Sequence, residues 1–391
     1  MSFVERFLGV RREDAPLLYY TYFAFLVSGM MSTVLGAILP SLSAEYQLSY
    51  SVQGSLLSFH QIGNLLAVYL AGFLPFAIGR KKSTLIGASG IILGLVLMTL
   101  YGNPFYLMFA FALTGMGRGT LSNMTNVVVG QTTANKAGGL NLLHACFAVG
   151  AFVSPLIAMA VGDPRWKWPC WIISALMLTA LILLGSSSLE NRKGGKVTDK
   201  GERAFLRDGA FWLNTMIMFF YLCAEASLTG WLVTYFKDTG MIPASLAPSV
   251  QSLLWIMILA GRLVCASLSN RMNKSTLILI LGCVITAFFC LMVFSGTPAL
   301  AVTGVLGVGL SMSGIYPTTL STMPGKYNSS TVATGTCIAV ATIGGIIMPM
   351  IIGAVAEAAG LALAISLILF ALVIMLVLMV IKFMTAGKGR A

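Results

Sequence analysis

Five ionisable side chains stand inside long apolar stretches of this sequence, where a charge needs a specific environment. They are His60, Arg118, His144, Glu225 and Arg262. An ionisable group at the centre of a lipid bilayer costs on the order of 3 kcal/mol on insertion scales, so it usually faces a cavity or a partner. Proton transfer, hydrogen bonding and pairing with anions are the chemistry that these side chains offer.

Glu225 is the only acidic residue well inside an apolar stretch. A carboxyl group there can bind and release a proton when it faces water on the two sides of a membrane in turn, as proton coupling requires. The alternative is a structural glutamate that is hydrogen-bonded or paired with Arg118. We expect Glu225 to bind the substrate, to carry a coupled proton, or both.

Arg118 lies too deep in its apolar stretch for its side chain to reach the membrane surface. Its guanidinium can bind a carboxylate through two parallel hydrogen bonds, which favours an organic anion as the substrate. A salt bridge between helices is the competing structural role. Gly115 and Gly119 are four residues apart, a spacing that allows close contact between helices.

Side-chain amides recur at helical spacing in the same stretches. Residues three apart share a helix face, and amides both donate and accept hydrogen bonds, which suits sugar hydroxyl groups. Hydrogen bonds between helices are the competing use. The pair of Asn141 and His144 can serve either a gate or the substrate site. His60 is interpreted as a structural histidine. The pairs are Gln61 with Asn64, Asn123 with Asn126, and Asn141 with His144.

Aromatic rings complete the candidate site, because the apolar C–H face of a sugar packs on a ring while its hydroxyl groups form hydrogen bonds. Trp231 and Tyr316 are the candidates for this contact, and packing in the core is the alternative. Trp166, Trp168 and Trp171 cluster at the edge of an apolar stretch and are typical of an interfacial belt.

Membrane-spanning helices must position these residues. Of the 391 residues, 58% are hydrophobic and 9% are charged, whereas roughly 25% are charged in an ordinary soluble domain. This excludes a water-soluble enzyme. The charge-poor stretches, with turns at 102–104 and 296–298, accommodate about twelve spans of about 20 residues each. We expect an all-α polytopic membrane protein whose twelve or so helices form two pseudo-symmetric six-helix bundles.

The positive charges are distributed unevenly among the connecting segments. With the N-terminus inside, 19 of the 24 Lys and Arg residues fall in inward segments, three in outward segments and two within spans. This bias predicts that both termini are cytoplasmic, and it accounts for the net charge of +12 without a nucleic-acid partner. We expect an integral protein of a bacterial inner membrane that contacts membrane lipid and is a monomer.

An extended polar segment divides the chain near its middle. It predicts a cytoplasmic lead-in at 1–16, a six-helix bundle at 17–186, a linker at 187–208, a second bundle at 209–384 and a tail at 385–391. Two short segments of the first half align with segments of the second at one offset of 194 residues, which is also the spacing from Pro155 to Pro349. This match favours a duplicated design.

A short basic turn follows the second span as Gly79-Arg80-Lys81-Lys82 and recurs as 270–274 after the eighth. Both turns resemble the loop motif G-x-L-A-D-R-x-G-R-K of the major facilitator superfamily, although Phe76 stands at the position of the motif's central acid. The resemblance implies two six-helix halves with the substrate between them near the bilayer midplane. It also implies a gating role for the basic residues of these turns, here Arg80, Lys81 and Arg271. Arg262 stands near the cytoplasmic end of its span, where it can make a gate contact or bind anionic lipid.

Four spans are similar to the branch that includes the fucose, galactose and glucose proton symporters. They contain LNLLHACFAVGAFVSPLI, YLCAEASLTGWLVTY, GLSMSGIYPTTLS and ATGTCIAVATIGGIIMPMIIG. The branch carries proton-coupling acids on its first and fourth spans, but this first span has no acid and the fourth has Arg118 instead. That proton mechanism therefore does not transfer directly, and Glu225 is the remaining candidate.

The sequence thus predicts a secondary active transporter of a small polar solute, with a sugar as the leading substrate and a proton, or alternatively sodium, as the coupling ion. An organic anion bound by Arg118 and efflux of amphipathic drugs are the transport alternatives, and a membrane sensor or enzyme is the alternative of another class. The seven cysteines show no metal-ligand spacing, and no nucleophile with its base or P-loop is present. We expect no cofactor, no metal and no enzymatic activity.

Overall fold

The computed structural model describes most of the chain. Most of the expected linker at 187–208, the first seven residues of the lead-in and the last three residues of the tail lie outside the described residues. The described residues are 8–71, 74–187, 189, 203–269, 271–324 and 330–388.

Long helices account for nearly all of the described residues, which contain no strand. This confirms the expected all-α fold with twelve long helices. Three short elements join them, namely α4 (Leu74–Ile78), η1 (Asp163–Arg165) and η2 (Arg203–Arg207). The long helices are α2 (Ala15–Tyr46), α3 (Tyr50–Leu70), α5 (Arg80–Leu97), α6 (Pro104–Thr132), α7 (Lys136–Val161), α8 (Lys167–Ser186), α9 (Gly209–Thr239), α10 (Ala247–Leu268), α11 (Lys274–Phe294), α12 (Pro298–Ser321), α13 (Thr331–Ala359) and α14 (Leu361–Lys388).

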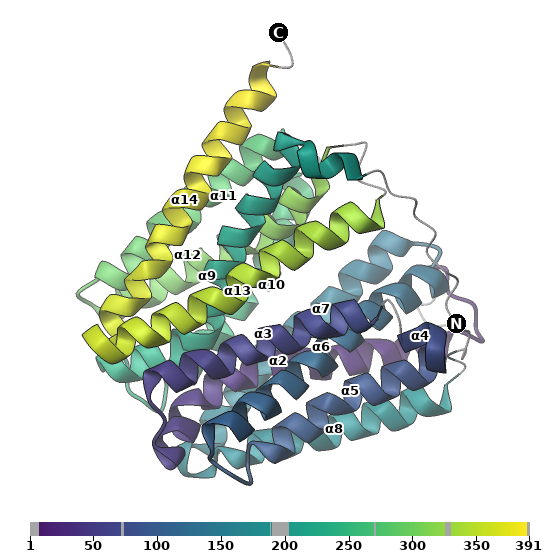
Figure 1. Ribbon diagram of the computed structural model, residues 1–391, viewed down its shortest axis with the longest axis horizontal. Coiled ribbons are helices and arrows are strands. Elements are labelled where there is room, and N and C mark those ends of the chain that lie inside the picture. The colour runs from purple at the N-terminus through teal and green to yellow at the C-terminus, as the bar shows by residue number, and fades with distance from the viewer. Residues whose placement is uncertain are drawn as a thin grey trace. The chain divides into compact units, whose positions relative to one another are not determined.

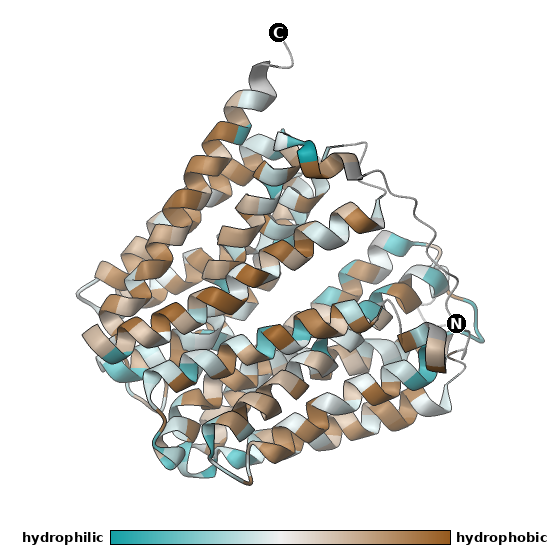
Figure 2. Ribbon diagram, in the orientation of Figure 1, coloured by the Kyte–Doolittle hydropathy of each residue, from teal (hydrophilic) through white to brown (hydrophobic). Residues whose placement is uncertain are grey.

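The composition of the helices suits a lipid environment. Within the described part of the chain, nine helices are long and apolar enough to cross a membrane. Figure 2 shows hydrophobic residues along the length of the helices and hydrophilic residues gathered mainly at helix ends and connections. An α-helix satisfies its own backbone hydrogen bonds, so it is the form that an apolar chain can adopt in lipid.

Local turn chemistry sets the helix ends that the sequence predicted. The Asn103 side chain accepts hydrogen bonds from the backbone N–H groups of Phe105 and Tyr106, and α6 begins at Pro104. At the corresponding turn, Thr297 caps α12, which begins at Pro298. Proline fits the first helical turn because its missing N–H would have no partner there.

Contacts between the helices divide the chain into two compact units. Unit 1 comprises residues 1–48 and 59–196, and unit 2 comprises residues 49–58 and 197–391. Within unit 1, α2 packs along α7, and α5 packs against α6 and α8; within unit 2, α9 packs along α13 and α14, and α12 packs against α10 and α11 (Figure 1). Helix α3 therefore begins in unit 2 and ends in unit 1, which the sequence did not indicate.

A proline in α7 is matched by a hydroxyl group of a neighbouring helix. Pro155 lacks an N–H, so the carbonyl of Ala151 loses its partner within α7. Thr33 of α2 donates its hydroxyl hydrogen to that carbonyl at 3.0 Å. A buried threonine thus restores the hydrogen bond that the proline removes.

Candidate functional site

In unit 1, Arg118 lies against an aromatic group from two other helices. Its guanidinium carbon is 5.8 Å from the centre of the Phe147 ring. Phe147 in turn contacts Phe25 with ring centres 5.1 Å apart, and Phe25 meets His144 edge-on at 5.6 Å. Arg118 comes from α6, the two phenylalanines come from α7 and α2, and His144 comes from α7. The arrangement combines a cation, a hydrogen-bonding imidazole and ring surfaces.

His60 on α3 forms a hydrogen-bonded chain with α6. Its Nδ1 lies 2.9 Å from Thr114 Oγ1, and the Thr114 hydroxyl donates to the carbonyl of Phe111 at 2.7 Å. The Phe111 backbone is also a hydrogen-bond partner of His60, so two groups of α6 hold the imidazole. Arg118 lies close enough for its charge to act on His60.

Glycines bring α3 and α6 into close contact beside these residues. A Cβ atom at Gly115 would overlap the backbone carbonyl of His60, and one at Gly119 would overlap the backbone and side-chain oxygens of Asn64. The close packing expected from the spacing of these two glycines is therefore present. It places Asn64 and His60 on the part of α3 that faces α6.

The remaining amides of unit 1 have different surroundings. Asn126 donates to the carbonyl of Ser122 in its own helix at 2.7 Å. The Nδ2 atom of Asn123 is buried without a hydrogen-bond partner. Gln61 is partly exposed, and Asn141 is exposed. The structure groups His60, Asn64 and Arg118 along α3 and α6 and leaves Asn141 at the surface.

In unit 2, Glu225 belongs to a group around the buried Tyr221. The Tyr221 hydroxyl donates to the backbone carbonyl of Met312 at 3.1 Å. Its ring is 6.2 Å from that of Tyr316, and Glu225 and Arg262 lie close enough for their charges to act on Tyr221. Glu225, Tyr316 and Arg262 are partly exposed, whereas Tyr221 is 3% exposed. This group offers a carboxylate, a guanidinium and two phenols.

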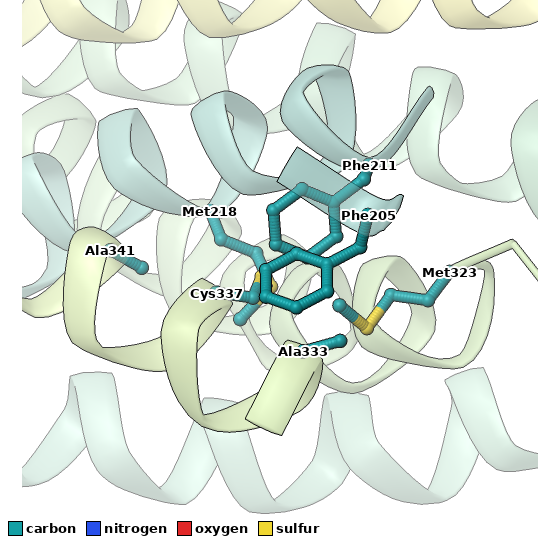
Figure 3. Close-up of a cluster of buried hydrophobic side chains, with 7 residues drawn as sticks. All are labelled: Phe205, Phe211, Met218, Met323, Ala333, Cys337 and Ala341. Atoms are coloured by element: carbon teal, nitrogen blue, oxygen red, sulfur yellow. The ribbon is translucent and has the colours of Figure 1, made fainter. Parts of the chain in front are cut away.

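A buried apolar cluster supports this group. Figure 3 shows the phenylalanine rings, the methionines and Cys337 packed between α9, α13 and the segment after α12. Tyr316 packs against the same cluster. Its members are Phe205, Phe211, Met218, Met323, Ala333, Cys337 and Ala341.

Trp231 lies apart from the Glu225 group. Its side chain is 0% exposed, and its ring centre is 6.3 Å from that of Tyr50 on the first turn of α3. The indole nitrogen is buried without a hydrogen-bond partner. In this structure, Trp231 therefore has the buried environment of a core residue.

The basic residues assigned to gating occupy helix ends. Arg80 donates to Gln131 Oε1 at 2.9 Å, and Lys81 donates to the carbonyl of Ser187 at 3.0 Å. Arg271 is exposed. Arg262 differs from these three, because the structure places it beside Tyr221.

Sequence reasoning missed Tyr221, Phe25 and Phe147. Tyr221 stands one helical turn before Glu225, so the i, i+4 spacing was an available signal. No local pattern marks the two phenylalanines, because their role depends on which helices pack together. Among the described residues, no group of three or more His, Cys, Asp or Glu side chains could hold a metal ion.

Comparisons with known proteins agree with this architecture. The profile of the Major Facilitator Superfamily matches residues 21–338. An uncharacterized MFS-type transporter of Bacillus subtilis, YfkL, is 26% identical over 364 residues, which cover 90% of each chain. The glucose/mannose transporter GlcP of the same organism is 23% identical over 351 residues, which cover 85% of this chain and 86% of that protein.

Solved structures share the fold at low sequence identity. The crystal structure of the nucleoside transporter NupG matches with a TM-score of 0.80 at 12% identity, covering 95% of this chain and 100% of that one. The D-xylose-proton symporter matches with a TM-score of 0.74 at 14% identity, covering 93% and 97%. The described residues form twelve long helices, and the family profile matches most of the chain. This protein is therefore a membrane transporter that belongs to the Major Facilitator Superfamily.

Proposed function

We propose that the protein is a secondary active transporter that moves a sugar by alternating access and couples it to proton movement through Glu225. The observation that carries this proposal is that Glu225 and Arg262 both lie close to the buried Tyr221, whose ring neighbours that of Tyr316. A carboxylate and two phenols can exchange hydrogen bonds with sugar hydroxyl groups in both directions. The similarity to a glucose/mannose transporter supports the same substrate class.

Glu225 is the proposed proton carrier because its environment can favour either protonation state. A nearby guanidinium favours a carboxylate and apolar surroundings favour a neutral acid. Glu225 shares the neighbour Tyr221 with Arg262 and lies on the apolar helix α9. Glu225 is partly exposed, so a change of conformation can alter its contact with water. Coupling requires this kind of balance, since a permanently paired carboxylate would not take up a proton.

Transport of an organic anion is the second candidate function. It is favoured by the Arg118 guanidinium, which lies over Phe147 in a group with His144 and Phe25. A guanidinium next to a ring surface can bind the carboxylate of an aromatic or aliphatic acid. Arg118→Gln distinguishes the two candidates, because it should abolish uptake of an organic anion but leave uptake of a sugar.

We also propose that both termini face the cytoplasm of a bacterial cell and that the transporter is a monomer. The uneven distribution of Lys and Arg supports this orientation. In this arrangement residues 17–186 and 209–384 are the two halves, and residues 187–208 link them on the cytoplasmic side. A reporter enzyme that is active only outside the cytoplasm, fused after residue 391, should remain inactive.

Uptake into proteoliposomes tests the transport proposal. Labelled glucose, mannose and a panel of carboxylates are offered with and without an inward proton gradient. We expect sugar uptake that the gradient stimulates, and we expect Glu225→Gln to abolish that stimulation. Glu13→Gln is the matched control, because Glu13 is exposed and pairs only with the exposed Arg11 among the described residues.

Two results would contradict the proposal. If Glu225→Gln takes up sugar under the proton gradient as fast as the parent protein does, Glu225 does not carry the coupled proton. Carboxylate uptake that is lost in Arg118→Gln, with no sugar uptake under any condition, would establish the organic anion as the substrate.

A further inference from the structure

The first turns of α3 are fastened to unit 2 by polar contacts. The Tyr50 hydroxyl donates to Asp238 Oδ1 at 2.5 Å, at the end of α9. The Ser58 hydroxyl donates to the carbonyl of Ile346 on α13 at 2.5 Å. Residues 49–58 thus pack as part of unit 2, although the rest of α3 belongs to unit 1.

The backbones of α3 and α13 approach each other closely at two glycines. A Cβ atom at Gly54 would overlap the carbonyl of Pro349, and one at Gly353 would overlap the carbonyl of Tyr50. Hydrophobic stabilisation scales with the apolar area removed from water, so a contact between glycines gains little from this effect. The hydrogen bonds described above, and that of the Ser51 N–H to Glu357 Oε2 at 3.4 Å, therefore contribute to holding this segment, together with the buried Leu56 and Leu57.

Beneath the segment, α9 carries a row of polar groups that lack partners. Ser227 Oγ, Trp231 Nε1 and Thr234 Oγ1 are buried without a hydrogen bond. At 100° per residue these positions fall within one narrow arc of the helix. Tyr50 lies against Trp231, and a Cβ atom at Gly230 would meet the Leu57 side chain, so α3 covers this arc.

Buried polar groups in native proteins are nearly always hydrogen-bonded, so three unpaired groups in one row require an explanation. Another conformation that exposes the row to water or a polar ligand would satisfy them. The exposed fractions here are 0% for Ser227, 0% for Trp231 and 6% for Thr234. The cost of leaving them unpaired also makes the covered conformation easier to open.

We propose that Ser227, Trp231 and Thr234 form a solute-binding strip that residues 49–58 of α3 cover in this structure and uncover during transport. The strip suits a polyhydroxylated solute, because the indole ring can pack on C–H groups while the indole N–H and two hydroxyl groups form hydrogen bonds. This inference rests on the proposed function for the class of solute. It extends the site from the Glu225 group to a second face of α9.

Cysteine reactivity tests the covering. Ser227→Cys and Thr234→Cys are treated with a polar maleimide in the full-length protein, and the reaction of the seven native cysteines is subtracted. We expect slow labelling that accelerates at least about tenfold when Tyr50→Phe removes the hydrogen bond to Asp238. Thr215→Cys is the control position, because Thr215 is 0% exposed on the same helix and its hydroxyl group is already hydrogen-bonded.

Tyr22→Phe is the matched control for Tyr50→Phe. It removes a hydroxyl group that donates to the carbonyl of Gly139 at 3.2 Å in unit 1, and it should leave labelling at Ser227→Cys and Thr234→Cys unchanged. Labelling at the two strip positions that stays as slow as at Thr215→Cys, even with Tyr50→Phe, would overturn the proposal. This measurement needs no solute, so it stands even if the protein does not transport sugars.

Contact with the solute is tested by protection and by Trp231→Phe. Glucose should slow labelling of Thr234→Cys in the Tyr50→Phe background, and any other solute that the uptake assay identifies replaces glucose if glucose is not transported. Trp231→Phe removes an N–H that bonds to nothing here, so a purely structural tryptophan predicts unchanged uptake. We expect instead a KM raised roughly 5- to 10-fold, as for one lost hydrogen bond. Absence of protection together with an unchanged KM overturns the solute contact.

Discussion

The Thr114 hydroxyl group has two hydrogen bonds to maintain in unit 1. It donates to the carbonyl of Phe111 and is hydrogen-bonded to His60 Nδ1. Thr114→Val keeps the shape but removes one hydrogen-bond partner of the buried imidazole, so we expect a loss of about 0.5–1.5 kcal/mol in the free energy of unfolding. Thermal melting of the purified protein, followed by fluorescence, measures it.

Thr120→Val is the control for this prediction. Thr120 is also on α6 and donates to a carbonyl of its own helix, Met116, at 2.9 Å, with no further polar side chain as partner in the described part of the chain. It should melt close to the parent. Equal melting temperatures for Thr114→Val and Thr120→Val would show that His60 does not depend on Thr114.

The residue scale also shows what the sequence could predict about the site. Glu225, Arg118 and Arg262 were identifiable because the cost of burying a charge depends on residue type and depth, whatever the fold. Tyr221 was within reach of the same reasoning, because it stands one turn before Glu225 on α9. Phe147 contacts Arg118 from another helix, so its role required the packing. Asn141 also had the residue type and spacing expected of a site residue; it is exposed in this structure, and its role stays a prediction.

At the scale of the element, a proline in one helix is coupled to a threonine in another. Thr33→Val should leave the Ala151 carbonyl unpaired and destabilise the protein by about 1–3 kcal/mol. In a Pro155→Ala background the helix supplies its own N–H to that carbonyl, so the same change should cost less. The expected coupling energy of this double-mutant cycle is about 0.5–3 kcal/mol.

Thr21→Val separates this coupling from the general effect of removing a threonine from α2. Thr21 is 0% exposed, as Thr33 is, but donates to Leu17 of its own helix at 2.7 Å. Its effect should be the same with and without Pro155. An additive cycle for Thr33 and Pro155 would contradict the assignment of the hydrogen bond.

Helix ends were predictable because they depend on residues that are close together in the sequence. The turns before Pro104 and Pro298 follow from the residues at the turns themselves, so the sequence predicted them correctly. The division of α3 between the units depends on glycines at 54 and 353, which are far apart in the chain. A single sequence shows that these positions are glycine, but it does not show that they meet.

At the scale of the whole molecule, α3 is the helix that contributes to both units, so its attachment to unit 2 must change if the units move during transport. Gly54→Ala places a methyl group where the Pro349 carbonyl lies. We expect this change to prevent residues 49–58 from packing on α13, because backbone atoms on both sides cannot move aside as a flexible side chain would. Thr234→Cys should then react with maleimide as fast as in Tyr50→Phe, and uptake should fall at least about tenfold, because the covered state becomes too rarely populated.

Gly130→Ala is the matched control, because a Cβ atom at Gly130 on α6 meets nothing within 4 Å. It should leave both uptake and reactivity as in the parent. Size-exclusion profiles of the two alanine variants must agree for the comparison to concern conformation, since a misfolded protein would also lose uptake. A folded Gly54→Ala protein with normal uptake and an unreactive Thr234→Cys would mean that α3 accommodates the methyl group, and that the close contact with α13 is not what holds the strip covered.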